Sequence, residues 1–239
     1  MIYLTGDTHG KIDIKKIFDW QEGQNLTKED YLIILGDFGL IFYGKDHELY
    51  EREQKLIKKL NDCPWTTLFV DGNHENFRML NEFPEETWNG GKIKKIADSI
   101  LWLKRGQVFN IDGKKFFTLG GGTSLDKGKR LFLVTWWPEE NITYGEINES
   151  IKNLSNNNYQ VDYVLTHCAP ESFKEDLFKV LKLQSFGTCS NEKALENIKN
   201  RINFKKWFFG HYHFDLIQKD YVALYDRIIN LEDKLIQNG

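Results

Sequence analysis

The sequence has few cysteines and no excess of positive charge. Its three cysteines, Cys63, Cys168 and Cys189, are widely spaced and form no CxxC pair. This spacing fits neither a disulfide framework nor a structural zinc knuckle. The formal net charge is −3 and the isoelectric point is about 6.1, so the chain lacks the overall basic character of proteins that bind extended nucleic acid. Extended nucleic acid is therefore not the expected partner.

The sequence also lacks a long apolar run and a charged leader. Its first residues, MIYLTGD, lead directly into a strand-like segment, which predicts neither a signal peptide nor a membrane span. We therefore expect a cytoplasmic protein with reduced thiols and no membrane partner. With 239 residues, 41% of them hydrophobic and 28% charged, the chain falls in the globular class, and a single domain over residues 1–239 is expected. The sequence does not predict an oligomeric state.

Short apolar runs alternate with amphipathic stretches along the chain. The runs typical of buried strands lie at 2–4, 31–35, 67–70, 163–165 and 207–209. Apolar residues at helical spacing lie over 14–18, 49–60, 147–154 and 194–202. Between 100 and 122, strand-like runs are broken by Arg105-Gly106 and by Asp112-Gly113, and the second dipeptide is a hairpin signal. This order predicts an α/β fold with an antiparallel section.

Each of the five predicted buried strands is followed by side chains that can bind a metal ion. In open α/β sheets, the loops after the carboxyl ends of the strands form the active site. The side chains brought to this edge would be those of Asp7, His9, Asp37, Asn73, His74, His167, His211 and His213. Of the six histidines, only His47 lies outside these loops. One such loop would be ordinary turn or capping chemistry, but the recurrence after every strand indicates a common site.

The residue types select the kind of site. Carboxylate, imidazole and amide oxygen without thiolate suit first-row divalent ions and argue against a structural zinc site. Seven such ligands exceed the needs of one four-coordinate ion, whereas two ions about 3.5 to 4 Å apart, bridged by a carboxylate, would use them all. The sequence therefore predicts two divalent metal ions as cofactors, drawn from Mn2+, Fe2+/3+, Zn2+ and Ni2+.

The order of these motifs resembles the calcineurin-like metallophosphoesterase superfamily, and in particular its small bacterial-type members. The superfamily series GDxH, GD, GNH, H and GHxH is matched here by residues 6–9, 36–37, 72–74, 167 and 210–213. The resemblance implies a four-layer αββα sandwich. Two mixed β-sheets flanked by helices would place a dimetal site at the C-terminal edge of their strands.

The resemblance also implies a role for each side chain. One ion would be held by Asp7, His9, Asp37 and His213, and the other by Asp37, Asn73, His167 and His211. Asp37 would bridge the two ions together with a hydroxide that attacks phosphorus in line, since metal binding lowers the pKa of water to about 7 in strongly activating sites. His74 matches a histidine that stays off the metals, meets the phosphoryl group and protonates the leaving oxygen. Asp37 and His74 are thus the predicted catalytic residues.

The implied activity is metal-dependent hydrolysis of a small phosphorylated substrate. A phosphomonoester is slightly favoured, because a nuclease would be expected to carry a basic groove for the phosphate backbone. A phosphodiesterase or nuclease acting on small nucleotides is the alternative. A third interpretation is a non-catalytic metal-binding scaffold, which is disfavoured because the metal ligands and His74 are all retained.

The sequence departs from the protein phosphatases of this superfamily at two motifs. Those enzymes extend the second motif to GDxxDRG and write the third as RGNHE, whereas this chain has GDFGLIFYG and DGNHE. The arginines that grip phosphate are therefore absent, as is the aspartate that supports the catalytic histidine. The departures count against protein phosphatase activity.

Other residues are candidates for contacting the substrate. They are Lys127, Lys129, Arg130, Trp137 and, more weakly, Arg78. Lys127, Lys129 and Arg130 follow the glycine run 120–122. They either replace the missing arginines that bind phosphate or form a solvated loop. Trp137 either lines a substrate lid formed by 127–140 or packs in the core. The glycine run lacks the GxxxxGK[ST] spacing of a P-loop, and we interpret it as a strand end that passes close to the metals.

Overall fold

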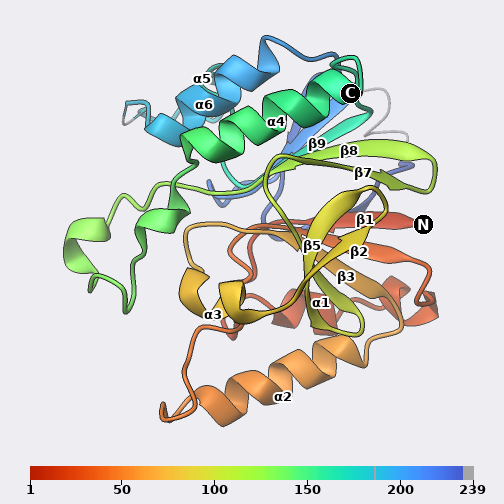
Figure 1. The fold of residues 1–239 in the computed structure, drawn as a ribbon, viewed down its shortest axis with the longest axis vertical. Helices are drawn as coiled ribbons and strands as arrows, with labels where there is room; N and C mark the ends of the chain where they lie inside the picture. Colours follow the sequence, from red (N-terminus) through yellow and green to blue (C-terminus); the bar gives the residue numbers. More distant parts are fainter. Residues whose placement is uncertain (186, 234–239) are drawn as a thin grey trace.

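The computed structural model describes residues 1–185 and 187–233, which form two β-sheets packed face to face (Figure 1). Within these residues the first sheet has the strand order β13 (Ile228–Asn230), β1 (Ile2–Thr5), β2 (Tyr31–Leu35), β3 (Thr66–Val70), β6 (Ile100–Leu103), β5 (Gly91–Ala97) and β4 (Glu85–Trp88). The second has the order β11 (Leu216–Ile217), β12 (Tyr221–Ala223), β10 (Lys206–Phe209), β9 (Tyr163–Thr166), β8 (Lys114–Leu119) and β7 (Gln107–Ile111). Strands β1, β2, β3 and β6 pair in parallel, as do β8, β9, β10 and β12, and the outer pairs are antiparallel.

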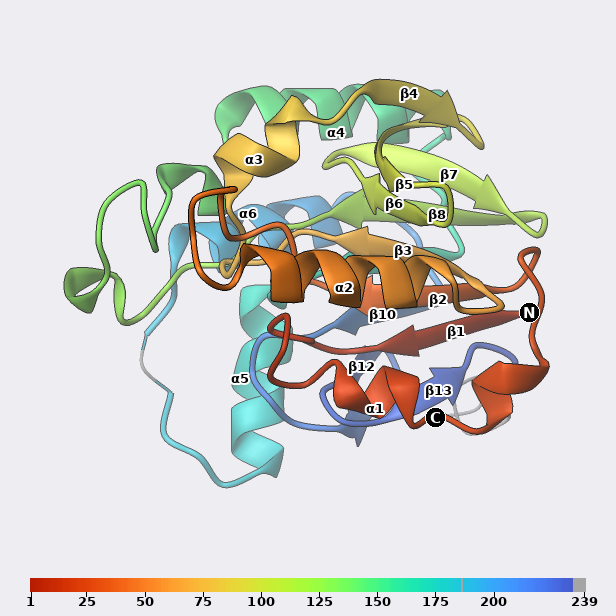
Figure 2. The ribbon, with the colours of Figure 1, turned by 90° about the horizontal axis from the view of Figure 1, so that it is seen from below.

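Helices cover the outer face of each sheet (Figures 1 and 2). The first sheet is covered by α1 (Lys15–Phe18), α2 (Tyr50–Asn61) and α3 (Phe77–Glu82), and the second by α4 (Tyr144–Asn156), α5 (Glu171–Val180) and α6 (Ser190–Lys199). Three short 3-10 turns complete the described elements: η1 (Glu22–Asn25), η2 (Lys127–Lys129) and η3 (Pro138–Glu140). Among the described residues, no helix is both long and apolar enough to cross a membrane.

Buried apolar side chains account for the four layers. One cluster takes side chains from both sheets, among them Leu4 and Phe208, and fills the space between the sheets. A second joins the first sheet to its helices and includes Leu60, and a third does the same for the second sheet and includes Leu195. Each fully buried Leu or Phe side chain contributes about 1.5–3 kcal/mol relative to exposure. The predicted αββα sandwich is confirmed.

The antiparallel section lies where the sequence predicts it. Asp112 and Gly113 both have positive φ, 49° and 72°, and join β7 to β8, as a two-residue hairpin turn requires. The parallel strands of both sheets end at one edge of the molecule, where the ring of His167, after β9, contacts the end of β2. Its Nδ1 lies 2.8 Å from the carbonyl oxygen of Leu35. The two sheets are thus joined at the edge where the motif loops lie.

Candidate metal centre

The motif loops hold several of their polar residues in a backbone conformation that is rare for residues with side chains. His9, Asp37, His211 and His213 have φ of 42°, 45°, 68° and 56°. Residues in this left-handed region persist only when the surrounding structure fixes them, and they cluster at functional sites. This conformation explains how two histidines one residue apart, His211 and His213, can serve different positions of one site.

Asp37 lies at the centre of the site and is 2% exposed. Its Oδ2 is 3.2 Å from Nε2 of His9, and its Oδ1 is 3.3 Å from Nε2 of His167. Oδ1 also accepts the backbone N–H groups of Asn73, at 2.8 Å, and His74, at 2.7 Å. The two oxygens of one fixed carboxylate therefore face two different histidines, which is the geometry of a bridging ligand.

On one side of Asp37, the ligand atoms of Asp7, His9 and His213 lie within 4.8 Å of one another. Oδ2 of Asp7 is fully buried, has no hydrogen-bond partner in the described structure, and lies 3.1 Å from Nε2 of His213. A buried carboxylate oxygen without a donor is costly unless a cation neutralises it. The arrangement therefore fits a bound metal ion.

On the other side of Asp37, atoms of the types that bind metal ions face one another. Nε2 of His167 lies 3.1 Å from Oδ1 of Asn73 and 3.2 Å from Nδ1 of His211. Separations of this size are expected between ligands that each lie about 2.0–2.2 Å from one ion. The donor set, two imidazoles, an amide oxygen and the Asp37 carboxylate, suits a first-row divalent ion.

Two of the histidines are held in the tautomer that a metal requires. Nδ1 of His9 lies 2.7 Å from Oδ2 of Asp13, and Nδ1 of His167 lies 2.8 Å from the Leu35 carbonyl oxygen. Each Nδ1 donates its proton to that oxygen, which leaves Nε2 directed at the site. Sequence inspection missed Asp13, because nothing in the motif marks a carboxylate four residues after His9.

His74 is half-buried at the edge of the centre, with its ring 5.0 Å from that of His9. Its Nε2 lies 2.8 Å from Nη2 of Arg130, whose Nε pairs with Asp126 at 2.8 Å. Since a guanidinium only donates, Nε2 of His74 accepts and the ring proton is on Nδ1. Burial lowers the pKa of His74, and the Arg130 charge lowers it further against the opposing charge of Asp37. The hydrogen-bond partner of the His74 ring is therefore an arginine.

Asn73 is oriented by a buried chain of hydrogen bonds that sequence inspection missed. Oε1 of Glu140 accepts the Ser124 N–H at 3.0 Å, and Oε2 accepts the Ser124 hydroxyl at 2.6 Å. The hydroxyl oxygen then accepts from Nδ2 of Asn73 at 3.2 Å. Glu140 is fully buried, and its position turns the amide so that Oδ1 of Asn73 faces His167.

Comparison with known proteins places this geometry in a family. A family model described as calcineurin-like phosphoesterase matches residues 1–215. The chain belongs to the calcineurin-like phosphoesterase family. Its similarity to this family therefore extends over both sheets and includes all five motif loops.

Individual relatives are more distant. The lariat debranching enzyme of Schizosaccharomyces pombe is 25% identical over 207 residues, which cover 78% of this chain and 43% of that enzyme. That of Saccharomyces cerevisiae is 32% identical over 101 residues, 36% of this chain and 24% of the enzyme. A solved structure of a candidate 5′-nucleotidase from Staphylococcus aureus has 15% identity and a TM-score of 0.45, covering 94% of this chain and 48% of that one. This chain spans less than half the length of each of these three proteins.

The candidates for contacting the substrate are placed differently from one another. Arg130 reaches His74, whereas Lys127 and Lys129 are exposed on η2 and Arg78 is exposed on α3. Trp137 is 2% exposed and packs against Phe42 with ring centroids 5.4 Å apart. Its position is that of a core residue, as in the packing alternative, and it is not exposed as the wall of a pocket must be.

The glycine run lies against the metal ligands as expected. A Cβ atom on Gly122 would lie 2.8 Å from Cδ2 of His167 and 2.9 Å from Oδ1 of Asn73. A Cβ atom on Gly210 would lie 2.2 Å from Oδ1 of Asp7. Only glycine therefore lets these backbone segments pass so close to the ligands.

In the metal-free protein, the nearby carboxylates keep two histidines of the centre protonated. Burial lowers the pKa of His9, but the hydrogen bond and charge of Asp37 outweigh it and raise the pKa to about 9. Burial also lowers the pKa of His167, but the negative charges of Asp37 and Asp7 outweigh burial and raise this pKa to about 10. Burial and then the His167 charge lower the pKa of His211 to about 3. The metal-free centre is thus doubly protonated near neutral pH.

Metal binding near neutral pH is expected to release about two protons per chain, because His9 and His167 must each free Nε2 for a ligand bond. Calorimetric titration of chelator-treated protein in buffers of different ionisation enthalpy measures this number. The release from these two histidines should fall towards zero as the pH rises through about 9 and 10. A release near zero at neutral pH would contradict the assignment.

The same shifts predict how the stability of the metal-free protein depends on pH. Both folded-state pKa values are raised above 6.5, so their contribution is complete below that pH and is lost as the pH rises through about 9 to 10. The Tm of chelator-treated protein should therefore fall over this range.

Glu140→Gln is expected to weaken the metal site that contains Asn73 by about 10- to 100-fold, the usual effect of losing an outer-shell partner. The amide would present a donor to the Ser124 N–H or hydroxyl and disturb the orientation of Asn73. Competitive metal titration measures the affinity without requiring activity. Glu139→Gln, at an exposed neighbouring position, is the matched control. Equal affinities in the two variants would show that Glu140 does not orient Asn73.

Proposed function

We propose that this protein hydrolyses small phosphorylated compounds with two divalent metal ions. The geometry of Asp37 supports this proposal most strongly, because its buried carboxylate faces His9 with one oxygen and His167 with the other, in a chain that matches the phosphoesterase family model over residues 1–215. Manganese, iron, zinc and nickel suit the donor set. When bound, such ions supply a nucleophile at neutral pH and neutralise charge on the phosphoryl oxygens.

The protein side chains would hold the ions in two groups that share one residue. Asp7, His9, Asp37 and His213 would hold one ion, and Asp37, Asn73, His167 and His211 the other. The backbone N–H groups of Asn73 and His74 fix the Asp37 carboxylate between them. This fixed carboxylate would keep the two groups of ligands at a constant separation, so that one phosphoryl group could contact both ions.

Arg130 and His74 would act on the substrate itself. A guanidinium pairs well with phosphoryl oxygens, and Arg130 is already 2.8 Å from His74 at the edge of the centre. When Arg130 pairs with the phosphoryl group, Nε2 of His74 becomes free. The negative charge of the substrate then raises the pKa of His74, which favours a ring that donates a proton from Nε2 to the leaving oxygen.

A phosphomonoester is the first candidate substrate, and one recess supports a small phosphodiester as the second. A hollow of about 360 Å³ adjoins His211 and is lined in part by Leu125, Phe178 and Tyr212. Its size and aromatic lining suit a planar organic group. A diester carries a second organic group on one of the oxygens that stay on phosphorus, whereas a monoester does not.

The proposed function is tested by hydrolysis of a chromogenic aryl phosphomonoester and the matching diester by manganese-reconstituted protein. Activity on either ester that is lost after chelation and restored by metal supports the proposal. A preference for the monoester identifies a phosphatase, and a preference for the diester directs the search to small nucleotides. Absence of metal-dependent hydrolysis of both esters, in protein shown to hold two ions, would count against the proposal and favour a metal-binding scaffold.

A further inference from the structure

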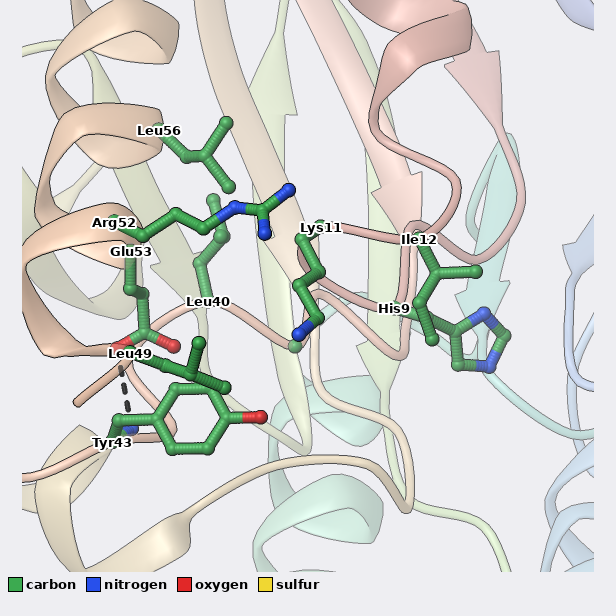
Figure 3. A pocket seen from close by; sticks show the side chains of 10 residues that line it. His9, Lys11, Ile12, Leu40, Tyr43, Leu49, Arg52, Glu53 and Leu56 are labelled. Carbon is green, nitrogen blue, oxygen red and sulfur yellow. Dashed lines mark hydrogen bonds between the residues drawn. The ribbon is translucent and has the colours of Figure 1, made fainter. Parts of the chain in front are cut away.

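A small hollow, lined in part by His9, lies between α2 and the turn after His9 (Figure 3). Its volume is about 70 Å³, which suits a compact ion better than a nucleobase. Lys11, in the turn after His9, and Arg52, on α2, extend into the space between these two elements. The hollow therefore brings together two cationic side chains from segments about forty residues apart in the chain.

Both cations are free to bind an anion. Neither the Lys11 ammonium nor the Arg52 guanidinium has an ion-pair or hydrogen-bond partner among residues 1–185 and 187–233. The acidic residue of the hollow, Glu53, is 4% exposed, and its carboxylate accepts the backbone N–H groups of Phe42 at 2.9 Å and Tyr43 at 3.2 Å. Glu53 thus holds the wall of the hollow in place and does not pair with either cation.

The floor of the hollow is fixed to the metal centre. The backbone N–H of His9 donates to the Asp37 carbonyl at 2.8 Å, and that of Gly10 donates to the Phe38 carbonyl at 3.0 Å. These bonds join the turn that carries Lys11 to the loop that carries Asp37. The position of Lys11 relative to the metal ligands is therefore set by backbone structure.

The hollow shares His9 with the candidate metal centre. His74, the proposed proton donor to the leaving oxygen, has its ring 5.0 Å from that of His9, and His9 lines the hollow. Apolar side chains, including Leu40 and Leu49, complete the lining. Apolar walls lower the local dielectric constant and strengthen the attraction between an anion and the two cations.

We propose that this hollow binds a phosphate-sized anionic group, and that the group is a second phosphoryl group on the leaving side of the substrate. This inference rests on the proposed function, because it places the scissile phosphoryl group at the metal centre. It narrows the substrate class to small compounds that carry two phosphoryl groups. A free phosphate ion has the same chemistry and is the other source that the experiment must distinguish.

The test is a calorimetric comparison of non-hydrolysable ligands binding to the metal-loaded protein. Methylphosphonate is compared with alkane bisphosphonates of increasing spacer length, in the natural protein and in the double variant Lys11→Gln, Arg52→Gln. A bisphosphonate of fitting length should bind at least about tenfold more tightly than methylphosphonate, the scale of hydrogen bonds to charged groups. In the double variant this ratio should fall to near one.

A matched variant controls for the change of net charge. Lys45→Gln, Lys55→Gln removes two exposed positive charges nearby and should keep the ratio of the natural protein. An equal fall in both double variants, or no fall in the first, would overturn the proposal. Two bound methylphosphonates per chain that become one in the Lys11, Arg52 variant would support an anion site filled by free phosphate and overturn its assignment to the substrate.

Because these readouts are binding constants, they are independent of turnover. A protein that hydrolyses neither test ester but shows the bisphosphonate ratio would retain the anion site and lose the proposed function. A protein that hydrolyses an ester without the ratio would retain the function and lose the anion site.

Discussion

Replacing Asp37 with asparagine is expected to lower turnover by about 10²- to 10³-fold, the scale on which removing a group that stabilises the transition state lowers kcat. The carboxylate uses Oδ1 towards His167 and Oδ2 towards His9. An asparagine can keep one oxygen, with its two backbone hydrogen bonds, but its amide nitrogen then faces the other ion as a donor. Both metal sites lose the bridging charge, so the affinity for both ions should fall.

The metal affinity of Asp37→Asn is measured by competitive titration, and its turnover by hydrolysis of the better test ester. Asp46→Asn makes the same chemical change at an exposed position and should behave as the natural protein does. A fully occupied Asp37→Asn protein with normal turnover would remove the bridging assignment.

Replacing His74 with alanine is expected to lower turnover by about 10²- to 10⁴-fold, the range for losing a general acid, while both metal ions stay bound. The hydrogen bond of the ring goes to Arg130, and the Asn73 and His74 N–H groups that hold Asp37 belong to the backbone. The loss should be larger for alkyl phosphates than for nitrophenyl phosphate, because a poor leaving group depends more on protonation.

The comparison of leaving groups separates proton donation from a structural role. His47→Ala, at the histidine outside the motif loops, is the matched control and should preserve turnover on every ester. An equal loss for good and poor leaving groups in His74→Ala, or loss of bound metal, would show that His74 does not act as the acid.

Much of the fold follows from local apolar patterns. The run at 31–35 is β2 in full, and the other four predicted strands differ from β1, β3, β9 and β10 by one residue at one end. Continuous apolar runs identify strands that are buried on both faces, as these are. Strand β4 was not predicted, because its sequence EETW is mostly polar and exposed at the sheet edge. Helix α5 was also missed, although its buried Phe173 and Leu177 lie at helical spacing.

The side chains predicted as metal ligands lie together for a related reason. They follow buried parallel strands, whose carboxyl ends must meet at one edge of the sheets. The groups that support them could not be predicted, since Asp13 and Glu140 reach the site through tertiary contacts with His9 and Ser124. For Trp137, the sequence pattern left two positions open. Adjacent tryptophans point in different directions on an extended segment, but the pattern does not say which one enters the core, and the structure places Trp137 there.

The central claim is that these loops bind two ions that share Asp37. Anomalous diffraction from crystals of the manganese-reconstituted protein, at the manganese absorption edge, tests it most directly. The account predicts two peaks about 3.5 to 4 Å apart, one among Asp7, His9, Asp37 and His213 and the other among Asp37, Asn73, His167 and His211. A single peak, or two peaks that do not share Asp37, would contradict it.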